Sequence, residues 1–456
     1  MPLILPGNVG SATAATELVS NSCRFNDGDT ASLSKTPSSN GSNTVWTVSM
    51  WCKRSHITTD QKIHAAGTSA TYELLFSDAD QLTLYNGSTT VFVTNRVFRD
   101  VSAWLNVVVS YNTGASGTDK CKLFINGTLE TSFATDNRSS AGAMNHINQS
   151  SQAQFVGNNN AGNGFDGYIA EVCVIDGTAL VATSFGEFDS DSEIWKPIDV
   201  SGLTFGTNGF YLDFEDSSNL GNDVNGGTDL TANNLAAIDQ STDNCINNFA
   251  VMNSIDNYFA GSTFSEGNLK VVTTGGNITY NTSTIGFSSG KWYMETKLAG
   301  SAGYTVGVVR GVATANDNGN KLGNRADGWS YDDGGDVEHN GGSLTGSFAS
   351  YSSGDIIGVY ADLDNNELYF SKNGTLQNSG TGLALTAGTY FFAVGDNNAS
   401  NSSTYEVNFG GTNTYSVSSG NTDGTYGNFE YSTTITGDGA SKIFKALNTK
   451  NLAEFG

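Results

Sequence analysis

The stretch Trp46-Thr-Val-Ser-Met-Trp-Cys-Lys53 decides the class of the fold. Its even-numbered positions carry Trp, Val, Met and Cys, whereas its odd-numbered positions carry Thr, Ser, Trp and Lys. A period of two is that of a half-buried β-strand, because successive side chains of a strand point to opposite faces. The stretch therefore predicts a strand that turns one face toward an apolar core.

The same alternation recurs further along the chain, in both of its halves. The segments that show it are Leu105–Tyr111, Cys121–Ile125, Ile357–Leu363 and Leu368–Phe370. Asn-Gly pairs punctuate such segments, and this dipeptide favours the positive φ angles of a type I′ hairpin turn. The pairs are Asn86-Gly87, Asn126-Gly127 and Asn373-Gly374.

Helical patterns are nearly absent. The best candidates are a short stretch at Ser441–Ala446 and a turn at Ala179–Phe185. The sequence therefore predicts an all-β fold of two tandem antiparallel β-sandwiches of about equal size. We expect their cores to contain Trp46, Val107, Leu123, Trp292, Ile357 and Phe370.

The charge of the chain restricts its partners. Acidic residues number 45 against 21 basic ones, which gives a formal net charge of -24. A polyanionic surface disfavours nucleic acid and anionic lipid as partners. The scattered carboxylates could bind Ca²⁺, but their arrangement in the sequence defines no metal site. We expect no membrane span either, since no run approaches the ~20 apolar residues that one needs.

The five cysteines are not arranged as a metal or redox motif, because none of them has CxxC spacing. Cys52, Cys121 and Cys173 each lie in a strand-like run. Cysteine is among the most buried residue types, so we expect these three to be small core residues.

The first half of the chain resembles the laminin G-like, concanavalin-type jelly roll over residues 20–200. The motifs that carry the resemblance are Trp46–Trp51, Trp104–Tyr111, Cys121–Gly127 and Phe165–Val172. Their order and spacing both fit that family, which implies a jelly-roll sandwich here. Residues 1–19 precede it, and we expect this leader to serve as an attachment segment.

The second half resembles a SPRY domain over residues 258–412. The motifs are Gly290–Glu295, Tyr304–Val308, Trp329–Tyr331, Gly354–Asp364, Leu368–Gly374, Tyr390–Val394 and Val407–Phe409. The resemblance implies a β-sandwich that binds partners through its loops and carries no catalysis. Between the two domains we expect a connector, 201–257, with one strand at Gly209–Glu215 that docks on one of them. After the domains we expect a C-terminal extension, 413–456, of which Lys445–Gly456 forms a surface tail.

The combination of domains resembles structural and tail-associated proteins of marine bacteriophages. The linking segments Phe185–Asp191 and Ile194–Pro197 and the end Ala446–Phe455 contribute to this resemblance. It implies a virion surface protein, assembled in the host cytoplasm, that acts as a tail-fibre-like adhesin or a capsid decoration. Its expected partners are host-surface glycan, other virion proteins and copies of itself, with a trimer as the expected homo-oligomer.

Two other functions stay open at this point. One is a glycan-degrading enzyme of the laminarinase-like fold, and the other is a purely architectural virion protein without a ligand. The run Glu187–Glu193 has the alternating carboxylates of such an enzyme, and retaining hydrolysis needs two carboxyls about 5–5.5 Å apart. Serines separate its last three acids and it follows the last matched strand, so we predict a polar loop, no catalytic residue and no enzyme.

Two further groups of polar residues have plain interpretations. Asp362–Glu367 opens like a calcium-binding loop but has Glu367 where that loop needs glycine, so a hairpin turn is predicted. The histidines share no metal-ligand spacing, and they are His56, His64, His146 and His339.

Lectin sites pair stacking aromatic rings with Asp or Asn acceptors that bond to sugar hydroxyls. On that logic the predicted ligand-binding residues are Trp329, Tyr331, Asp332 and Asp333 of the second domain. Trp329 could equally belong to the core. The acidic loop from Tyr331 to His339 is also a place where Ca²⁺ or a partner could bind. In the first domain, no loop residue is singled out.

Overall fold

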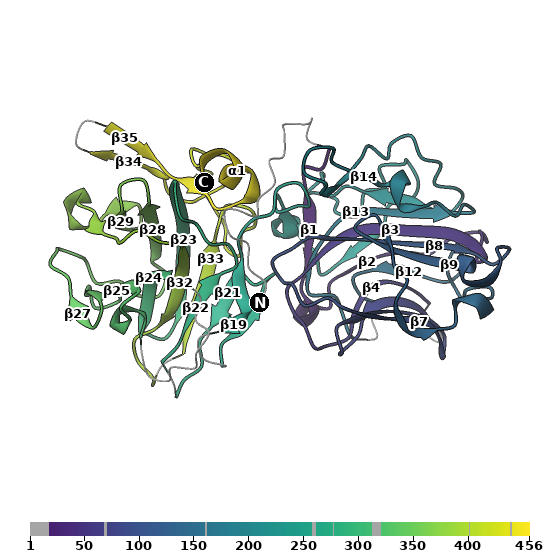
Figure 1. Cartoon of the computed structure of the whole chain (residues 1–456), viewed down its shortest axis with the longest axis horizontal. Helices are drawn as coiled ribbons and strands as arrows, with labels where there is room; N and C mark the ends of the chain where they lie inside the picture. Colours follow the sequence, from purple (N-terminus) through teal and green to yellow (C-terminus); the bar gives the residue numbers. More distant parts are fainter. Residues whose placement is uncertain are drawn as a thin grey trace. The chain divides into compact units, whose positions relative to one another are not determined.

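The computed structural model describes residues 18–67, 71–159, 162–257, 261–276, 278–311, 321–400, 402–437 and 440–456. Within these residues strands make up nearly all regular structure, and α1 (Thr449–Phe455) is the one α-helix. The all-β prediction is therefore confirmed. The described residues form an N-terminal unit, which ends at Ile246, and a C-terminal unit, Asn247–Gly456 (Figure 1). Among the described residues, no helix is long and apolar enough to cross a membrane.

Two antiparallel sheets form the N-terminal unit. The first contains, in spatial order, β10 (Thr128–Leu129), β9 (Cys121–Ile125), β8 (Leu105–Asn112), β3 (Val45–Arg54), β13 (Gly167–Asp176), β1 (Ser22–Phe25) and β18 (Gln240–Ser241), with β16 (Phe210–Leu212) paired to β13. The second contains β11 (Phe133–Asp136), β7 (Thr89–Val97), β6 (Gln81–Asn86), β5 (Tyr72–Phe76), β4 (Gln61–Ala66), β12 (Gln154–Val156), β2 (Ser32–Lys35) and β17 (Thr231–Asn233).

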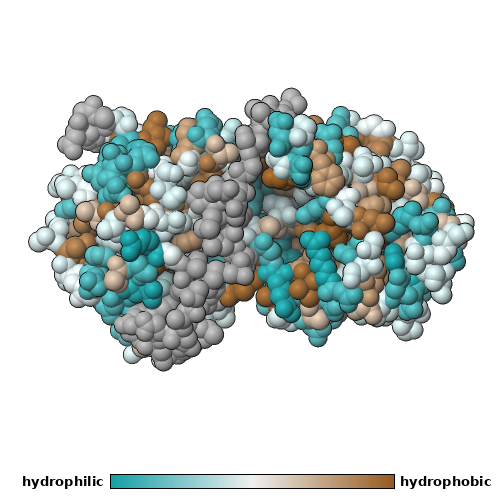
Figure 2. Space-filling view, in the orientation of Figure 1, coloured by the Kyte–Doolittle hydropathy of each residue, from teal (hydrophilic) through white to brown (hydrophobic). Residues whose placement is uncertain are grey.

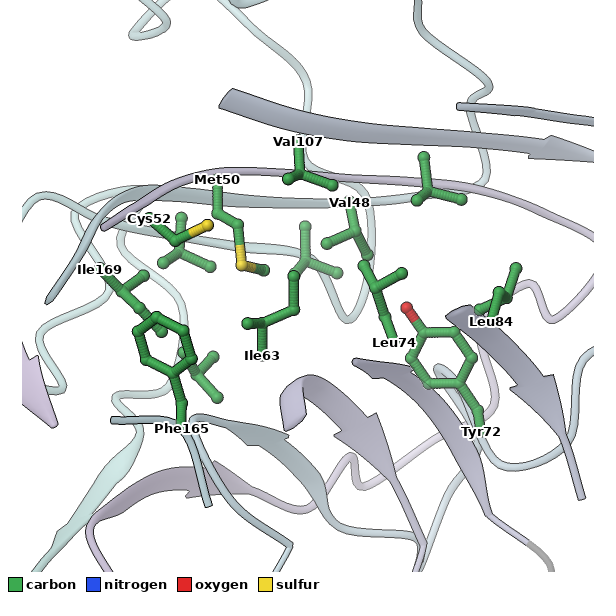
Figure 3. Close-up of a cluster of buried hydrophobic side chains, with 14 of the residues drawn as sticks. Val48, Met50, Cys52, Ile63, Tyr72, Leu74, Leu84, Val107, Phe165 and Ile169 are labelled. Atoms are coloured by element: carbon green, nitrogen blue, oxygen red, sulfur yellow. The ribbon is translucent and has the colours of Figure 1, made fainter. Parts of the chain in front are cut away.

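The core of the N-terminal unit lies between these two sheets. Figure 3 shows Val48 and Met50 of β3 and Val107 of β8 directed toward Ile63 of β4 and Leu74 of β5. All five side chains are fully buried, and each such side chain contributes about 1.5–3 kcal/mol to stability. The alternation read from the sequence therefore marks the face that each strand turns to its partner sheet.

The segment 201–257, expected as a connector, is largely part of the N-terminal sandwich. Its strand β16 pairs with β13, β17 pairs with β2, and β18 pairs with β1. The unit boundary lies at Ile246 and Asn247, and β19 (Met252–Asn257) already pairs with a strand of the C-terminal unit. The strand predicted at Gly209–Glu215 is confirmed as β16. The strands β17 and β18 have only three and two residues, too few for a period of two to show in a sequence rich in Asn, Asp and Gly.

Two large sheets, whose strands named here pair antiparallel, also form the sandwich of the C-terminal unit. The first contains β19, β22 (Tyr280–Ser283), β32 (Tyr390–Asp396), β24 (Tyr304–Arg310), β25 (Gly328–Asp332), β26 (Val337–His339) and β27 (Gly342–Ser343). The second contains β20 (Thr263–Ser265), β21 (Lys270–Val272), β33 (Ser403–Asn408), β23 (Lys291–Gly300), β28 (Ile356–Asp362), β29 (Glu367–Lys372) and β30 (Thr375–Leu376), with β31 (Leu383–Ala384) paired to β29. The six residues predicted for the two cores are all buried.

Residues 413–456 pack on the outer face of the second of these sheets. The prediction of a surface tail at Lys445–Gly456 is wrong, because Ala446, Leu447 and Leu452 are buried. Tyr293 and Tyr360 point away from the sandwich core, and their rings contact Phe429 at 4.8 Å and Phe444 at 5.2 Å between centroids. The strand β36 (Lys445–Ala446) then pairs in parallel with β23. The helix predicted at Ser441–Ala446 is wrong, because these residues fall in β35 (Ala440–Ile443) and β36.

A buried carboxylate fastens this layer to the sheet. Glu295 of β23 accepts hydrogen bonds from the Tyr415 hydroxyl at 2.9 Å and from the Glu430 backbone N–H at 2.7 Å. It also accepts one from Asn408 Nδ2 at 3.0 Å within the sheet. Burying a carboxylate is costly unless it is hydrogen-bonded. Glu295 can therefore be buried here only because these donors surround it.

The smaller sequence predictions have mixed outcomes. Both residues have positive φ at Asn126-Gly127 and at Asn373-Gly374, as a type I′ turn requires, whereas at Asn86-Gly87 only the glycine does. Cys52, Cys121 and Cys173 are free and buried, as predicted. The leader 1–19 lies, apart from its last two residues, outside the described residues.

Replacing Phe444 by alanine tests whether residues 413–456 are integral to the C-terminal unit. We expect a loss of about 3–5 kcal/mol in the free energy of unfolding, because the ring is fully buried. The neighbouring Ile443 is 44% exposed, so Ile443→Ala should change stability by less than about 0.5 kcal/mol. Urea unfolding of both variants makes the comparison, and equal effects would contradict the packing described.

Candidate functional site

The two aromatic residues predicted to bind a ligand are packing residues of the C-terminal unit. Trp329 of β25 is 2% exposed, stacks on His339 at 3.9 Å between ring centroids, and donates its Nε1–H to the Ala384 carbonyl. Tyr331 is fully buried and donates its hydroxyl to the Ala349 carbonyl. Neither ring presents a free face to a sugar, because other protein atoms pack around both rings.

The two acidic residues beside them organise loops. Asp332 accepts from the backbone N–H groups of Gly334 and Asp336 at 3.1 and 3.0 Å, and burial raises the pKa of its carboxyl. Asp333 accepts from the Gly303 N–H at 2.7 Å and from Asn397 Nδ2 at 3.0 Å. These bonds give both carboxylates a structural role.

The acidic run Glu187–Glu193 is a polar hairpin loop, as predicted. It joins β14 (Gly186–Phe188) to β15 (Trp195–Pro197). Asp189 accepts from the Ser192 and Asp191 N–H groups and from Lys196 Nζ at 3.1 Å, and these bonds hold the pKa of its carboxyl below its usual range. A carboxyl held ionised in this way does not serve as a general acid near neutral pH.

The run Asp362–Glu367 is the hairpin turn between β28 and β29, also as predicted. Lysines from two other segments neutralise its carboxylates. Lys442 Nζ lies 3.2 Å from Asp362 and also pairs with Glu367, while Lys291 pairs with Asp364. This turn is therefore an ion-pair network that joins 413–456 to the sheet.

A different carboxyl has an unusual environment. Glu171 lies at a bulge of β13 between Ala170 and Cys173, with φ of 52°, and it is buried. Its Oε2 accepts the Tyr211 hydroxyl at 2.8 Å, and Oε1 has no hydrogen-bond partner among the described residues. Burial raises the pKa of Glu171 to about 8. The group is thus a protonated packing residue at neutral pH, held under β16.

The raised pKa of Glu171 predicts how stability depends on pH. The folded protein favours the protonated carboxyl, so its contribution is present below pH about 4.5 and is lost as the pH rises through about 8. Stability should fall by up to about 1.4 kcal/mol per pH unit across this window.

In Glu171→Gln this fall should be flattened, while the exposed Glu187→Gln should behave as the unmodified chain. Urea unfolding measured from pH 4 to pH 9 distinguishes the two variants. If Glu171→Gln lost stability with pH as steeply as the unmodified chain, Glu171 would not be the group that causes the fall.

The best candidate for a binding site lies on the outer face of the β4–β5–β6 sheet. Ile63, Leu74 and Leu84 point into the core. By the alternation of a strand, Lys62, Glu73 and Tyr85 therefore point the opposite way. Glu73 and Tyr85 are directly opposite each other on β5 and β6. We call Lys62, Glu73, Tyr85 and Asn159 the Tyr85 face.

Polar contacts hold the Tyr85 face in place. Lys62 Nζ lies 3.4 Å from Glu73 and donates to Asn159 Oδ1 at 3.0 Å. Glu73 also accepts from Thr71 Oγ1 at 2.8 Å and from Asn159 Nδ2 at 3.3 Å. Burial raises the pKa of Tyr85, and the carboxylates of Asp60, Glu73 and Asp78 raise it further.

This arrangement suits a polar ligand with an apolar face. Tyr85 and Glu73 are half-buried, so part of each is open to solvent, while Lys62 and Asn159 are buried beneath them. A ring, a carboxylate, an ammonium and an amide at neighbouring positions offer stacking together with donors and acceptors. None of these residues was predicted from the sequence. The signal for Glu73 and Tyr85 was the alternation of Tyr72–Phe76 and Gln81–Asn86, which places polar residues on the face opposite the core.

Two family models match the chain. The model described as the concanavalin A-like lectin/glucanases superfamily, Laminin_G_3, matches residues 26–183. The SPRY domain model matches residues 291–412. The chain contains a concanavalin A-like domain and a SPRY domain. Both domain resemblances are thereby confirmed, and the Tyr85 face belongs to the concanavalin A-like domain.

Solved structures that match part of the chain include the SPRY domain of human HERC1. It is 19% identical, with 36% of this chain and 99% of that chain covered and a TM-score of 0.29. A human SPRY domain is 17% identical, with 32% and 96% covered and a TM-score of 0.26. Stonustoxin is 19% identical, with 35% of this chain and 27% of that chain covered and a TM-score of 0.27. No curated protein matches the chain.

Proposed function

We propose that this chain is a non-catalytic surface protein of a bacteriophage particle that binds host-surface glycan through the Tyr85 face of its concanavalin A-like domain. The observation that carries the glycan part is the placement of Tyr85 directly opposite Glu73, with Lys62 and Asn159 beneath. Sugars present apolar C–H faces and hydroxyl groups, and such a set of side chains meets both.

The charges on this face favour binding over hydrolysis. A retaining glycosidase needs two carboxyls about 5–5.5 Å apart, one as nucleophile and one as acid. Glu73 is instead paired with the Lys62 ammonium at 3.4 Å, and Asp60 accepts the Asp78 backbone N–H at 2.8 Å. A carboxylate that is ion-paired with an ammonium group stays ionised and can accept hydrogen bonds from a ligand.

The virion part of the proposal rests on a resemblance. The order of a concanavalin A-like domain and a SPRY domain, with the linking and terminal motifs, resembles that of tail-associated phage proteins. The net charge of the chain is negative, and on the side drawn in Figure 2 hydrophilic and hydrophobic residues are interspersed, but these features do not bear on the virion assignment. We propose assembly in the host cytoplasm as a homo-oligomer, with a trimer expected for a tail-fibre-like adhesin.

Substituting Tyr85 tests glycan binding directly. The purified chain should bind a subset of bacterial surface glycans on an array. Tyr85→Ala should weaken that binding at least about tenfold, or 1.4 kcal/mol, because the stacking ring is lost. Tyr85→Phe should retain most of the affinity if stacking dominates.

Tyr426→Ala is the matched control, since Tyr426 is an exposed tyrosine of the C-terminal unit. Unchanged binding by Tyr85→Ala would remove the Tyr85 face from the proposal. Absence of binding to any glycan by the unmodified, folded chain would favour the purely architectural alternative.

Cryo-electron microscopy of particles that carry this protein tests its location. For an adhesin we expect density at the tail or fibre, with the Tyr85 face turned outward. Density flat on the capsid lattice would indicate a decoration protein, and a Tyr85 face covered by neighbouring copies would contradict glycan binding there. Absence of the protein from purified particles would overturn the virion assignment.

A further inference from the structure

Three loops of the N-terminal unit converge at one end of its first sheet. The register places Phe25 of β1 opposite Gly167 of β13, and Gly167 opposite Arg54 of β3. The end of β1, the start of β13 and the end of β3 are therefore neighbours. Asp27 and His56 each lie two residues after a strand, β1 and β3 respectively, and Asp166 lies directly before β13. All three residues are therefore next to the ends of adjacent strands.

The side chains meet as potential metal ligands. One carboxylate oxygen of Asp27, one of Asp166 and one ring nitrogen of His56 all lie within 4.8 Å of one another. Ligand atoms around a Zn²⁺ ion lie about 2.0–2.2 Å from the metal, which puts them roughly 3.4 Å apart in a tetrahedral site. Bringing the ligand atoms together around an ion then needs a closing movement of at most about 1.4 Å.

The exposure of the three residues shows which of them would make this movement. Asp27 and His56 are exposed, so their side chains can rotate without displacing packed atoms. Asp166 is 4% exposed, and its backbone carbonyl accepts the Ser55 N–H at 2.9 Å. One anchored ligand and two adaptable ones form a partly preorganised site.

The charge of the surroundings supports a cation. Two carboxylates and a neutral imidazole carry a formal charge of -2. The cationic residues nearest in sequence each pair with another acid. These pairs are Arg24 with Asp239 at 2.9 Å, Lys53 with Asp243 at 2.8 Å, Arg54 with Asp80 at 3.2 Å and Lys62 with Glu73 at 3.4 Å.

We infer that Asp27, His56 and Asp166 form a binding site for one divalent transition-metal ion of the Zn²⁺ class. The imidazole decides the class, because Ca²⁺ and Mg²⁺ take oxygen ligands whereas imidazole suits Zn²⁺ and its neighbours. The ion would tie the loops after β1 and β3 to the start of β13, and water would complete its coordination. The residues of this site are not those of the Tyr85 face, and the inference does not depend on glycan binding.

Metal titration of the full chain tests the inference. After treatment with chelator and removal of it, isothermal titration with ZnCl₂ should show one ion per chain with micromolar affinity or better. Asp27→Asn and His56→Gln should each weaken the affinity at least about tenfold, as loss of a ligand does. Both residues are exposed, so these variants should fold even if Asp166→Asn does not.

Asp78→Asn, a change at an exposed carboxylate of the same unit, is the matched control and should bind Zn²⁺ as the unmodified chain does. Substitution with Co²⁺ gives a second readout, a visible absorption band that His56→Gln should shift or abolish. Two results would overturn the inference. One is no Zn²⁺ binding up to millimolar metal, or equal affinity in all variants, and the other is tighter binding of Ca²⁺ that does not require His56.

Discussion

The close approach of β13 to β3 at Gly167 is the constraint on which the concanavalin A-like domain depends. Gly167 has φ of 144°, and a Cβ added there would lie 2.1 Å from the Lys53 carbonyl oxygen. Only glycine allows the two backbones to pair at this point. The pairing continues along β13, and it sets which residues of both strands face the core.

Several features of the domain follow from that register. Val48, Met50 and Cys52 of β3 come to share a core face with Ile169 of β13. The register then shifts between Ala170 and Cys173, which turns Glu171 outward under Tyr211 of β16. At the other end, the same register brings the loops of Asp27, His56 and Asp166 together. Packing, a buried carboxyl and a cluster of ligand atoms thus share one geometric cause.

In the SPRY domain, the feature on which the packing depends is a layer of residues that covers the outer face of one sheet. Tyr293 and Tyr360 would be exposed on a bare sandwich, and residues 413–456 cover them with Phe429 and Phe444. Glu295 joins the same contact, and its donors come from both the sheet and the covering layer. One face of this sandwich is consequently closed to partners, so the chain uses intramolecular packing where an isolated domain would present a surface.

The sequence by itself determined the strands whose alternation is long enough to be seen, such as Trp46–Lys53 and Ile357–Leu363, and with them the class of the fold and both cores. It also determined the turns at Asn126-Gly127 and Asn373-Gly374, because positive φ is a local property. Short strands such as β17 and β18 were beyond the reach of the sequence, since two or three residues do not define a period.

Only the tertiary structure decided the sites. Trp329 is of a residue type that often binds ligands, but its ring stacks on His339 and its Nε1–H donates to the Ala384 carbonyl. Glu73 and Tyr85 become partners through strand pairing. Asp27, His56 and Asp166 have no recognisable spacing along the chain and become neighbours only across the β1–β13–β3 register. Alternation reports which way a side chain points, whereas a site requires knowing which strands lie next to each other, and that is a property of the assembled sheet.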